Sequence, residues 1–241
     1  MELDLNGDLG EGCPHDAELM PLITSANIAC GFHAGDAATA YDALILAAKH
    51  GVRVGAHPGF ADRDHFGRRE LVLTEKQIFE QCAYQIGALS GLARAVGIPL
   101  RYVKPHGALY HLACRDDAYA RPLVEAAALF DLEVMALPGS RLEVRCAGRC
   151  AFLREGFADR RYLPDGSLVP RTQPDAFVTD AAEAARQAEG LLRGRGIQTL
   201  CVHGDNPRAV EFVRALRAEL ARQGIVVKPF LTRRETPPSP P

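Results

Sequence analysis

Residues 26–56 read ANIACGFHAGDAATAYDALILAAKHGVRVGA, and this stretch has the pattern of a strand, a helix and a second strand. The apolar run 26–30 predicts a strand, and periodic apolar residues from about Thr39 to His50 predict a helix that ends at Gly51. Residues 52–56 predict the next strand. Because a helix between two strands is the repeating unit of parallel sheets, the stretch favours an α/β fold.

The same alternation continues on both sides of this stretch. Further strands are predicted near residues 3–5, 102–104, 134–137, 152–153, 199–202 and 225–227, and further helices over residues 74–96, 116–130, 140–148, 180–193 and 207–223. This count favours closure into a barrel of about seven parallel strands, with an open doubly wound sheet as the alternative. We expect one barrel domain over residues 1–232 and a disordered, proline-rich tail over residues 233–241.

Composition excludes several classes of protein. A chain of 241 residues that is 47% hydrophobic and 24% charged can bury one large core and is not a disordered protein. Its 28 basic and 30 acidic residues do not run in blocks, which argues against a nucleic-acid partner or a membrane surface. The seven cysteines have apolar neighbours, and no apolar run could span a bilayer. We therefore expect reduced cysteines in a soluble, cytoplasmic protein.

Polar and glycine-rich clusters follow one predicted strand after another. In a parallel barrel the carboxyl ends of all strands face one side, so we expect these clusters to form a single site. Their chemically active members are Asp8, Glu11, His33, Asp36, His57, Lys104, His106, His203 and Asp205. One histidine at a strand end is more often structural than catalytic, whereas four of them, joined by aspartates, favour a catalytic site.

Two kinds of bound group are left open by the motifs. The histidines and Asp8 could supply a nitrogen and oxygen site for a divalent metal, but no HxxxH or HExxH motif occurs. No GxxxxGK[ST] loop occurs, and no GxGxxG follows a strand, so a site for ATP would be atypical or shared with another chain. Two long loops, residues 60–69 and 157–171, carry arginines suited to binding carboxylate or phosphate.

The blocks around these residues resemble the LamB/YcsF family. They are residues 4–11 (DLNGDLGE), 25–36 (SANIACGFHAGD), 55–60 (GAHPGF), 66–69 (FGRR), 103–110 (VKPHGALY), 157–162 (FADRRY) and 201–205 (CVHGD). They occur in the order of the family and span about residues 2–230, nearly the whole chain. The chain departs from the family in a shorter segment between Glu11 and Pro21 and in Ala37, where proline is usual.

The resemblance implies a distorted β/α barrel related to glycoside hydrolase and deacetylase barrels. It also implies 5-oxoprolinase activity, in which the 5-oxoproline (pyroglutamate) lactam is hydrolysed to L-glutamate with ATP as co-substrate. A chain of this family would act as an A subunit together with B and C subunits. A homo-oligomer is compatible with the sequence.

Carried onto this chain, the resemblance suggests roles for individual residues. Lys104 and His106 would stabilise developing negative charge, and Asp8 or Glu11 would act as general base. Further catalytic candidates, as acids, bases or metal ligands, are His33, His57 and His203. Substrate-binding candidates are Asn6, Asn27, Asp36, Arg68, Arg69, Arg160 and Asp205, with one of the arginines on the substrate carboxylate.

Two other functions stay open at this point. The first is a metal-dependent deacetylase or amidohydrolase that acts alone, against which the absence of a closely spaced histidine pair counts. The second is a non-catalytic subunit that binds substrate.

Overall fold

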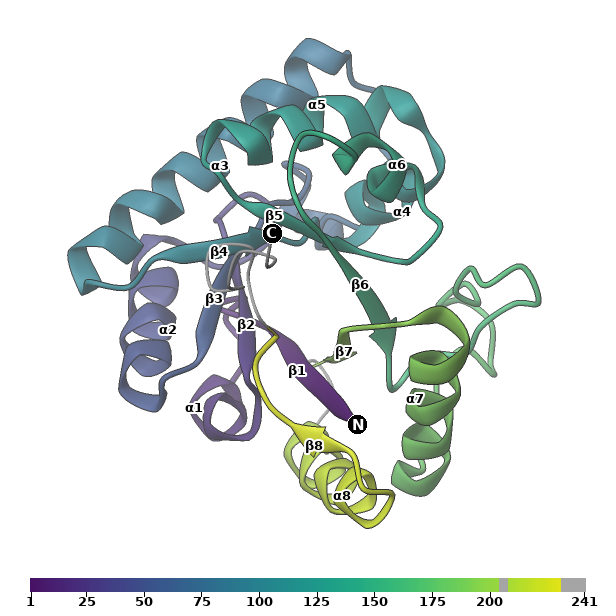
Figure 1. Cartoon of the computed structure of the whole chain (residues 1–241). Coiled ribbons are helices and arrows are strands. Elements are labelled where there is room, and N and C mark those ends of the chain that lie inside the picture. Colours follow the sequence, from purple (N-terminus) through teal and green to yellow (C-terminus); the bar gives the residue numbers. More distant parts are fainter. Residues whose placement is uncertain (204–207, 231–241) are drawn as a thin grey trace, which may run out of the picture.

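A computed structural model of the chain describes residues 1–203 and 208–230, and parallel strands form a closed ring at its centre (Figure 1). Each strand from β1 to β6 pairs with the next one along the chain, and β1 closes the ring by pairing with both β2 and β7. The ring strands are β1 (Glu2–Leu9), β2 (Ser25–Ala29), β3 (Arg53–His57), β4 (Leu100–Val103), β5 (Glu133–Ala136), β6 (Phe152–Phe157) and β7 (Thr199–Val202). The predicted parallel barrel is confirmed, and a short β8 (Val226–Val227) pairs with the start of β1.

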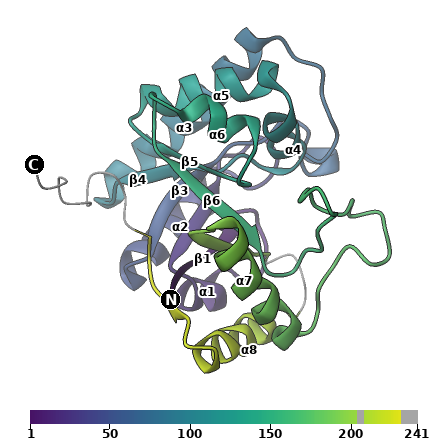
Figure 2. The ribbon, with the colours of Figure 1, turned by 45° about the vertical axis from the view of Figure 1, so that its right-hand side comes forward.

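Helices surround the ring on its outer side (Figures 1 and 2). They are α1 (Asp16–Leu19), α2 (Ala37–His50), α3 (Glu75–Val96), α4 (Gly107–Arg115), α5 (Asp117–Leu129), α6 (Arg141–Cys146), α7 (Ala181–Arg195) and α8 (Ala209–Arg222). Residues 158–180, between β6 and α7, extend away from the barrel and contain two antiparallel bridges. Within residues 1–203 and 208–230, none of the helices has the length and apolar character needed to cross a membrane.

The local signals predicted most helix boundaries correctly. Gly51 and Gly97 end α2 and α3 in the left-handed conformation that favours glycine. Thr74 and Gln77 form the predicted capping box of α3. Helix α2 begins at Ala37, two residues before the predicted Thr39, because the Asp36 side chain accepts a hydrogen bond from the Thr39 amide.

Two details differ from the predictions, and one further prediction falls outside the described residues. Helices α1 and α4 were not predicted, and α4 begins directly after His106, whose side chain makes no capping hydrogen bond. Strand β4 ends at Val103, so Lys104 lies just past it, where Pro105 offers no amide to continue the ladder. The expected tail, residues 233–241, lies outside the described residues.

The interior of the barrel is polar along β1. Asp4, Asn6 and Asp8 alternate with Leu3 and Leu5, and all five side chains are buried. Asp4 accepts hydrogen bonds from hydroxyl groups on β2 and β7 at 2.7 and 2.5 Å. The carboxylates and amides therefore have partners inside the ring, where burial without them would be costly.

Tyr102 fills the middle of this interior and is fully buried. Its hydroxyl donates to Oδ1 of Asn27 at 2.7 Å, and Asn27 in turn donates to Asn6 and Asp8. A Cβ added at Gly55 would lie only 2.3 Å from Cε2 of the Tyr102 ring. A glycine on β3 thus makes room for the ring that supports Asn27.

We expect Gly55→Ala to destabilise the fold because the added methyl group overlaps the Tyr102 ring on a rigid strand. Overpacking of this kind costs roughly 1–3 kcal/mol of unfolding free energy in urea denaturation. Gly91→Ala is the matched control, since Gly91 is exposed in α3 and its Cβ would meet nothing within 4 Å. This control is expected to stabilise by about 0.5–1 kcal/mol. Equal unfolding free energies for the two variants would contradict the steric argument.

Candidate active site

A cavity of about 860 Å³ lies where the carboxyl ends of the strands meet. It brings together predicted residues that are up to 195 positions apart in the chain, as expected for loops that follow parallel barrel strands. The predicted site residues that line it are Asp8, Glu11, His57, Arg68, Lys104, His106, Arg160 and His203. The strand-end argument therefore predicted the location of the cavity.

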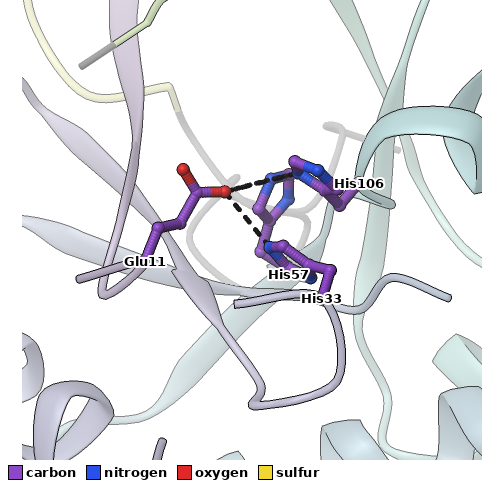
Figure 3. A group of neighbouring side chains, drawn as sticks. All are labelled: Glu11, His33, His57 and His106. Atoms are coloured by element: carbon purple, nitrogen blue, oxygen red, sulfur yellow. Dashed lines mark hydrogen bonds and ion pairs between the residues drawn. The ribbon is translucent and has the colours of Figure 1, made fainter. Parts of the chain in front are cut away.

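Three histidines surround one oxygen of Glu11 (Figure 3). Glu11 Oε1 lies 3.1 Å from His33 Nε2, 3.3 Å from His106 Nδ1 and 3.8 Å from His57 Nε2. His57 Nε2 and His106 Nδ1 are themselves 3.0 Å apart. The rings of His33 and His106 stack with their centroids 3.8 Å apart, whereas the His57 ring stands perpendicular to both.

Backbone carbonyls fix the orientation of two of these rings. His57 Nδ1 donates to the carbonyl of Lys104 at 2.7 Å, and His106 Nε2 donates to the carbonyl of Phe66 at 2.8 Å. Burial, reinforced by His57, lowers the pKa of His33 to about 2. Burial and the neighbouring His33 and His57 also hold the pKa of His106 well below its usual range. His33 and His106 are therefore neutral at physiological pH.

Two glycines hold the His33 ring in place against His106. A Cβ at Gly59 would lie 2.5 Å from His33 Nδ1, and one at Gly67 would lie 2.7 Å from His33 Cβ. Gly67 also has a φ of +63°, which side chains rarely adopt. The stack of the two imidazoles thus requires backbone without side chains on its outer face.

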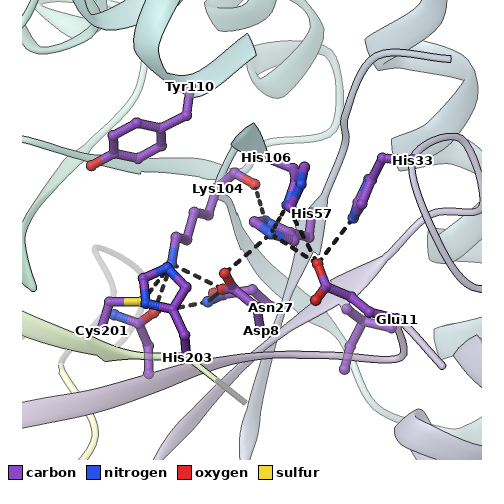
Figure 4. A network of polar contacts seen from close by, with 12 residues as sticks. Asp8, Glu11, Asn27, His33, His57, Lys104, His106, Tyr110, Cys201 and His203 are labelled. Carbon is purple, nitrogen blue, oxygen red and sulfur yellow. Dashed lines mark hydrogen bonds and ion pairs between the residues drawn. The ribbon is translucent and has the colours of Figure 1, made fainter. Parts of the chain in front are cut away.

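Lys104 is the central cation of the site (Figure 4). Its Nζ lies 2.9 Å from Asp8 and 2.9 Å from Glu155, and it donates to Asn6 at 3.2 Å and to Cys201 at 3.0 Å. These partners come from β1, β6 and β7, so the ammonium group connects three strands of the ring.

This arrangement sets the charges of the buried groups. Burial disfavours the charge of Asp8, but Lys104 and His57 outweigh it and hold the pKa of Asp8 well below its usual range. Burial likewise disfavours the charge of Lys104, but Asp8 and Glu155 raise the pKa of Lys104 well above its usual range. The site therefore contains a carboxylate and an ammonium group, both ionised, beneath the cavity.

His203 is oriented by a partner that the sequence reasoning missed. Its Nδ1 lies 2.8 Å from an oxygen of Asp159, and Asp159 also accepts from the His203 amide at 3.2 Å. The sequence reasoning also missed Glu155, which pairs with Lys104. It missed Tyr110 too, which donates to Glu155 at 2.8 Å. Strand β6 reads FLREGF, and this pair of charged residues inside a strand was the available signal for Glu155.

Other predicted residues lie away from the cavity lining. Asp36 caps α2 and is exposed, and Arg69 pairs with Asp62 at 3.1 Å. Asn6 and Asn27 lie in the hydrogen-bonded interior, where they contact Lys104 and Asp8. Asp205 lies outside the described residues. Asp36 and Arg69 thus have a helix cap and an ion pair as their partners, and their substrate contacts stay predictions.

Two groups of side chains within the described residues have a spacing that could hold a metal ion. The first is Glu11, His33, His57 and His106, and the second is Asp8, Cys201 and His203.

The groups that line the cavity also suit acid–base chemistry. The Asp8 carboxylate can act as a base, and imidazoles, Lys104 and arginines surround the same space. Such a set can take a proton from water and stabilise an oxyanion.

The comparisons with known proteins agree over nearly the whole chain. Residues 3–235 match the LamB/YcsF family. The 5-oxoprolinase A subunit of Thermus thermophilus is 46% identical, with 95% of this chain and all of the relative covered. The 5-oxoprolinase A subunit of Neisseria meningitidis is 45% identical, with coverages of 94% and 98%.

Two solved structures resemble the chain at different levels. The crystal structure of a lactam utilization protein from Thermus thermophilus has a TM-score of 0.88 and 42% identity, and 95% of this chain and all of that chain are covered. A family 4 carbohydrate esterase from Streptomyces lividans shares the fold alone, with a TM-score of 0.53 and 11% identity over 94% and 91% of the two chains. The ordered sequence blocks, the closed barrel and these matches together show that the chain belongs to the LamB/YcsF family.

Proposed function

We propose that this chain hydrolyses the lactam of 5-oxoproline to L-glutamate as the A subunit of an ATP-dependent 5-oxoprolinase. The main observation behind this proposal is an ionised carboxylate at the cavity. Asp8 pairs with Lys104, and its Oδ2 lies 3.4 Å from His57 Nε2. Relatives named as 5-oxoprolinase A subunits match it over nearly their full length, which supports the same assignment. The B and C subunits are the proposed partners in the cytoplasm.

Opening the lactam requires one bond to form, one bond to break and one proton to be transferred to the leaving nitrogen. A water oxygen bonds to the ring carbonyl carbon, the C–N bond breaks, and the ring nitrogen leaves as an amine that has gained a proton. Asp8 Oδ1 accepts from Lys104 and Asn27, so Oδ2 is the oxygen that would take the proton from water. Since its pKa is low, Asp8 is a weak base, and the carbonyl needs further activation.

His203 is the proposed donor to the leaving nitrogen. Asp159 fixes the ring through Nδ1, as a carboxylate does for a catalytic histidine. His203 lines the cavity, and one of its ring nitrogens lies within 4.8 Å of an Asp8 oxygen. The two proton-transfer groups can therefore act on one small ring.

ATP would provide the activation of the carbonyl. Transfer of the γ-phosphoryl group of ATP to the lactam oxygen, with ADP leaving, turns a stable amide into a group that water attacks readily. Cleavage of the C–N bond then leaves an acyl phosphate, which a second water hydrolyses to the carboxylate of glutamate and inorganic phosphate. Since the sequence has no phosphate-binding glycine loop, we place the nucleotide site on the partner subunits or at a shared interface. Arginines of this cavity would then meet the phosphorylated end of the substrate.

Arg160 is the proposed ligand of the substrate carboxylate. Its side chain is buried at the cavity and donates from Nη2 to the Val169 carbonyl at 2.6 Å, while its Nε has no hydrogen-bond partner among the described residues. Burial and the neighbouring Arg171 lower the pKa of Arg160 to about 10. A bound carboxylate would relieve this repulsion and satisfy the open donor.

Reconstitution tests the proposal. This chain is mixed with candidate B and C subunits, and glutamate and ADP are measured from 5-oxoproline and ATP while each chain is omitted in turn. We expect turnover only with all three chains, and a loss of at least about 100-fold for Asp8→Asn, because removing a proton-transfer group costs this much. Full turnover by a folded, assembled Asp8→Asn complex would instead indicate that this chain has a non-catalytic role.

In the same assay, Arg160→Gln should raise the KM for 5-oxoproline roughly 10- to 100-fold with a smaller change in kcat, because a charged hydrogen bond to the substrate is lost. Arg69→Gln is the matched control, since Arg69 lies outside the cavity lining and pairs with Asp62. It should leave KM unchanged. The same rise in KM for both variants would refute the assignment of Arg160.

The charge role of Lys104 can be tested through stability. Lys104→Met leaves Asp8 and Glu155 buried without their cation, and we expect a loss of about 3–5 kcal/mol in urea unfolding at pH 7. The double variant Lys104→Met/Glu155→Gln should recover part of this loss, since one unpaired carboxylate is removed. Lys76→Met, at an exposed ion pair, serves as control and should change stability by less than about 0.5 kcal/mol. No recovery in the double variant would contradict the paired-charge explanation.

A further inference from the structure

We infer that a divalent transition-metal ion of the zinc class binds Glu11 Oε1, His57 Nε2 and His106 Nδ1, with its next coordination position open to the cavity. These three residues line the cavity, and their side chains point toward one another in Figure 3. The inference goes beyond the proposed function, because binding can be measured on the isolated chain without substrate or ATP.

The first argument is the arrangement of lone pairs. A carbonyl oxygen only accepts hydrogen bonds, so His57 Nδ1 and His106 Nε2 carry the ring hydrogens. In the neutral rings, His57 Nε2 and His106 Nδ1 are then both bare acceptors, and they face each other at 3.0 Å. A proton on His57 Nε2 would satisfy one acceptor but would still leave His106 Nδ1, as an acceptor, facing Glu11 Oε1 at 3.3 Å. A single cation in the centre satisfies all three atoms.

The second argument is the spacing of these atoms. Zinc bonds of about 2.0–2.1 Å place the ligand atoms of a tetrahedral ion about 3.4 Å apart. The three distances of 3.0, 3.3 and 3.8 Å bracket this value. Metal-binding histidines also usually donate their outer N–H to a carbonyl or carboxylate, as both rings do here.

His33 is assigned a positioning role and not a place among the ligands. Its ring is parallel to that of His106, with 4° between the planes, so an ion in the plane of His106 lies outside the plane of His33. Its Nε2 is 3.1 Å from Glu11 Oε1 and donates there. His33 is also absent from the cavity lining. It would hold Glu11 and His106 in their ligating positions.

The second candidate group already contains a cation. Lys104 Nζ lies 2.9 Å from Asp8 and 3.0 Å from Cys201, which leaves its charge at the place a metal would take. The ion is therefore assigned to the histidine group. Bound there, it would supply Lewis-acid activation of a water or carbonyl oxygen beside Asp8, whose Oδ2 is 3.4 Å from His57 Nε2.

The test uses the purified full-length chain, freed of metal by a chelator and titrated with Zn²⁺. We expect one ion per chain by elemental analysis after dialysis, together with a rise in Tm that the chelator reverses. Titration with Co²⁺ should give the visible absorption of a four-coordinate site. No tight binding of either ion by the folded wild-type chain would overturn the inference.

Variants then locate the site. His57→Ala and His106→Ala should each weaken Zn²⁺ binding by more than about 100-fold, whereas His33→Ala should weaken it by about 10- to 100-fold and keep one ion per chain. His65→Ala is the surface control and should bind as the wild type, since His65 pairs with Asp62. Loss of the ion in His203→Ala but not in His57→Ala would overturn the assignment. Because these readouts need no turnover, a failed reconstitution and a failed metal site remain distinguishable.

Discussion

The buried ammonium group of Lys104 is the interaction on which the site depends. It lies 2.9 Å from both Asp8 and Glu155, which come from opposite parts of the chain. Without a cation, two carboxylates inside a barrel would take up protons or repel each other. Burying three charges costs several kcal/mol for each, so the group contributes less to net stability than to a fixed arrangement of charge. Asp8 keeps its negative charge at the cavity for this reason.

The polar barrel interior explains how the arrangement is held. Layers of branched apolar side chains fill most barrels of this type, but here Asn27 and Tyr102 form hydrogen bonds between the strands instead. Asn27 uses both amide hydrogens and its oxygen, and so it has one allowed orientation. Asp8 is thereby positioned by two hydrogen bonds, one from the Asn27 amide and one from the Lys104 ammonium group.

The sequence was sufficient for the barrel and for the position of the site, because both follow from local signals repeated along the chain. Capping residues such as Thr74 and stop glycines such as Gly97 act within one helical turn, and they were visible without tertiary structure. Helix α4 was missed because it begins at Gly107 without a side-chain cap. Partners such as Glu155 and Asp159 were missed because they meet Lys104 and His203 only through the register of the strands. Asp36 was assigned to substrate from its place in a cluster that follows a predicted strand, and its cap to Thr39 was not predicted.

The close packing of Gly59 and Gly67 against His33 has a consequence for protein engineering. Copying only the imidazoles and carboxylates of this site onto another barrel would not reproduce its geometry. The orientation of the His33 ring also depends on two loop positions, Gly59 and Gly67, that carry no side chain. In a mutational scan, substitutions of these two glycines should lower activity as substitutions of the reactive groups do, although glycine has no side chain with which to contact a ligand.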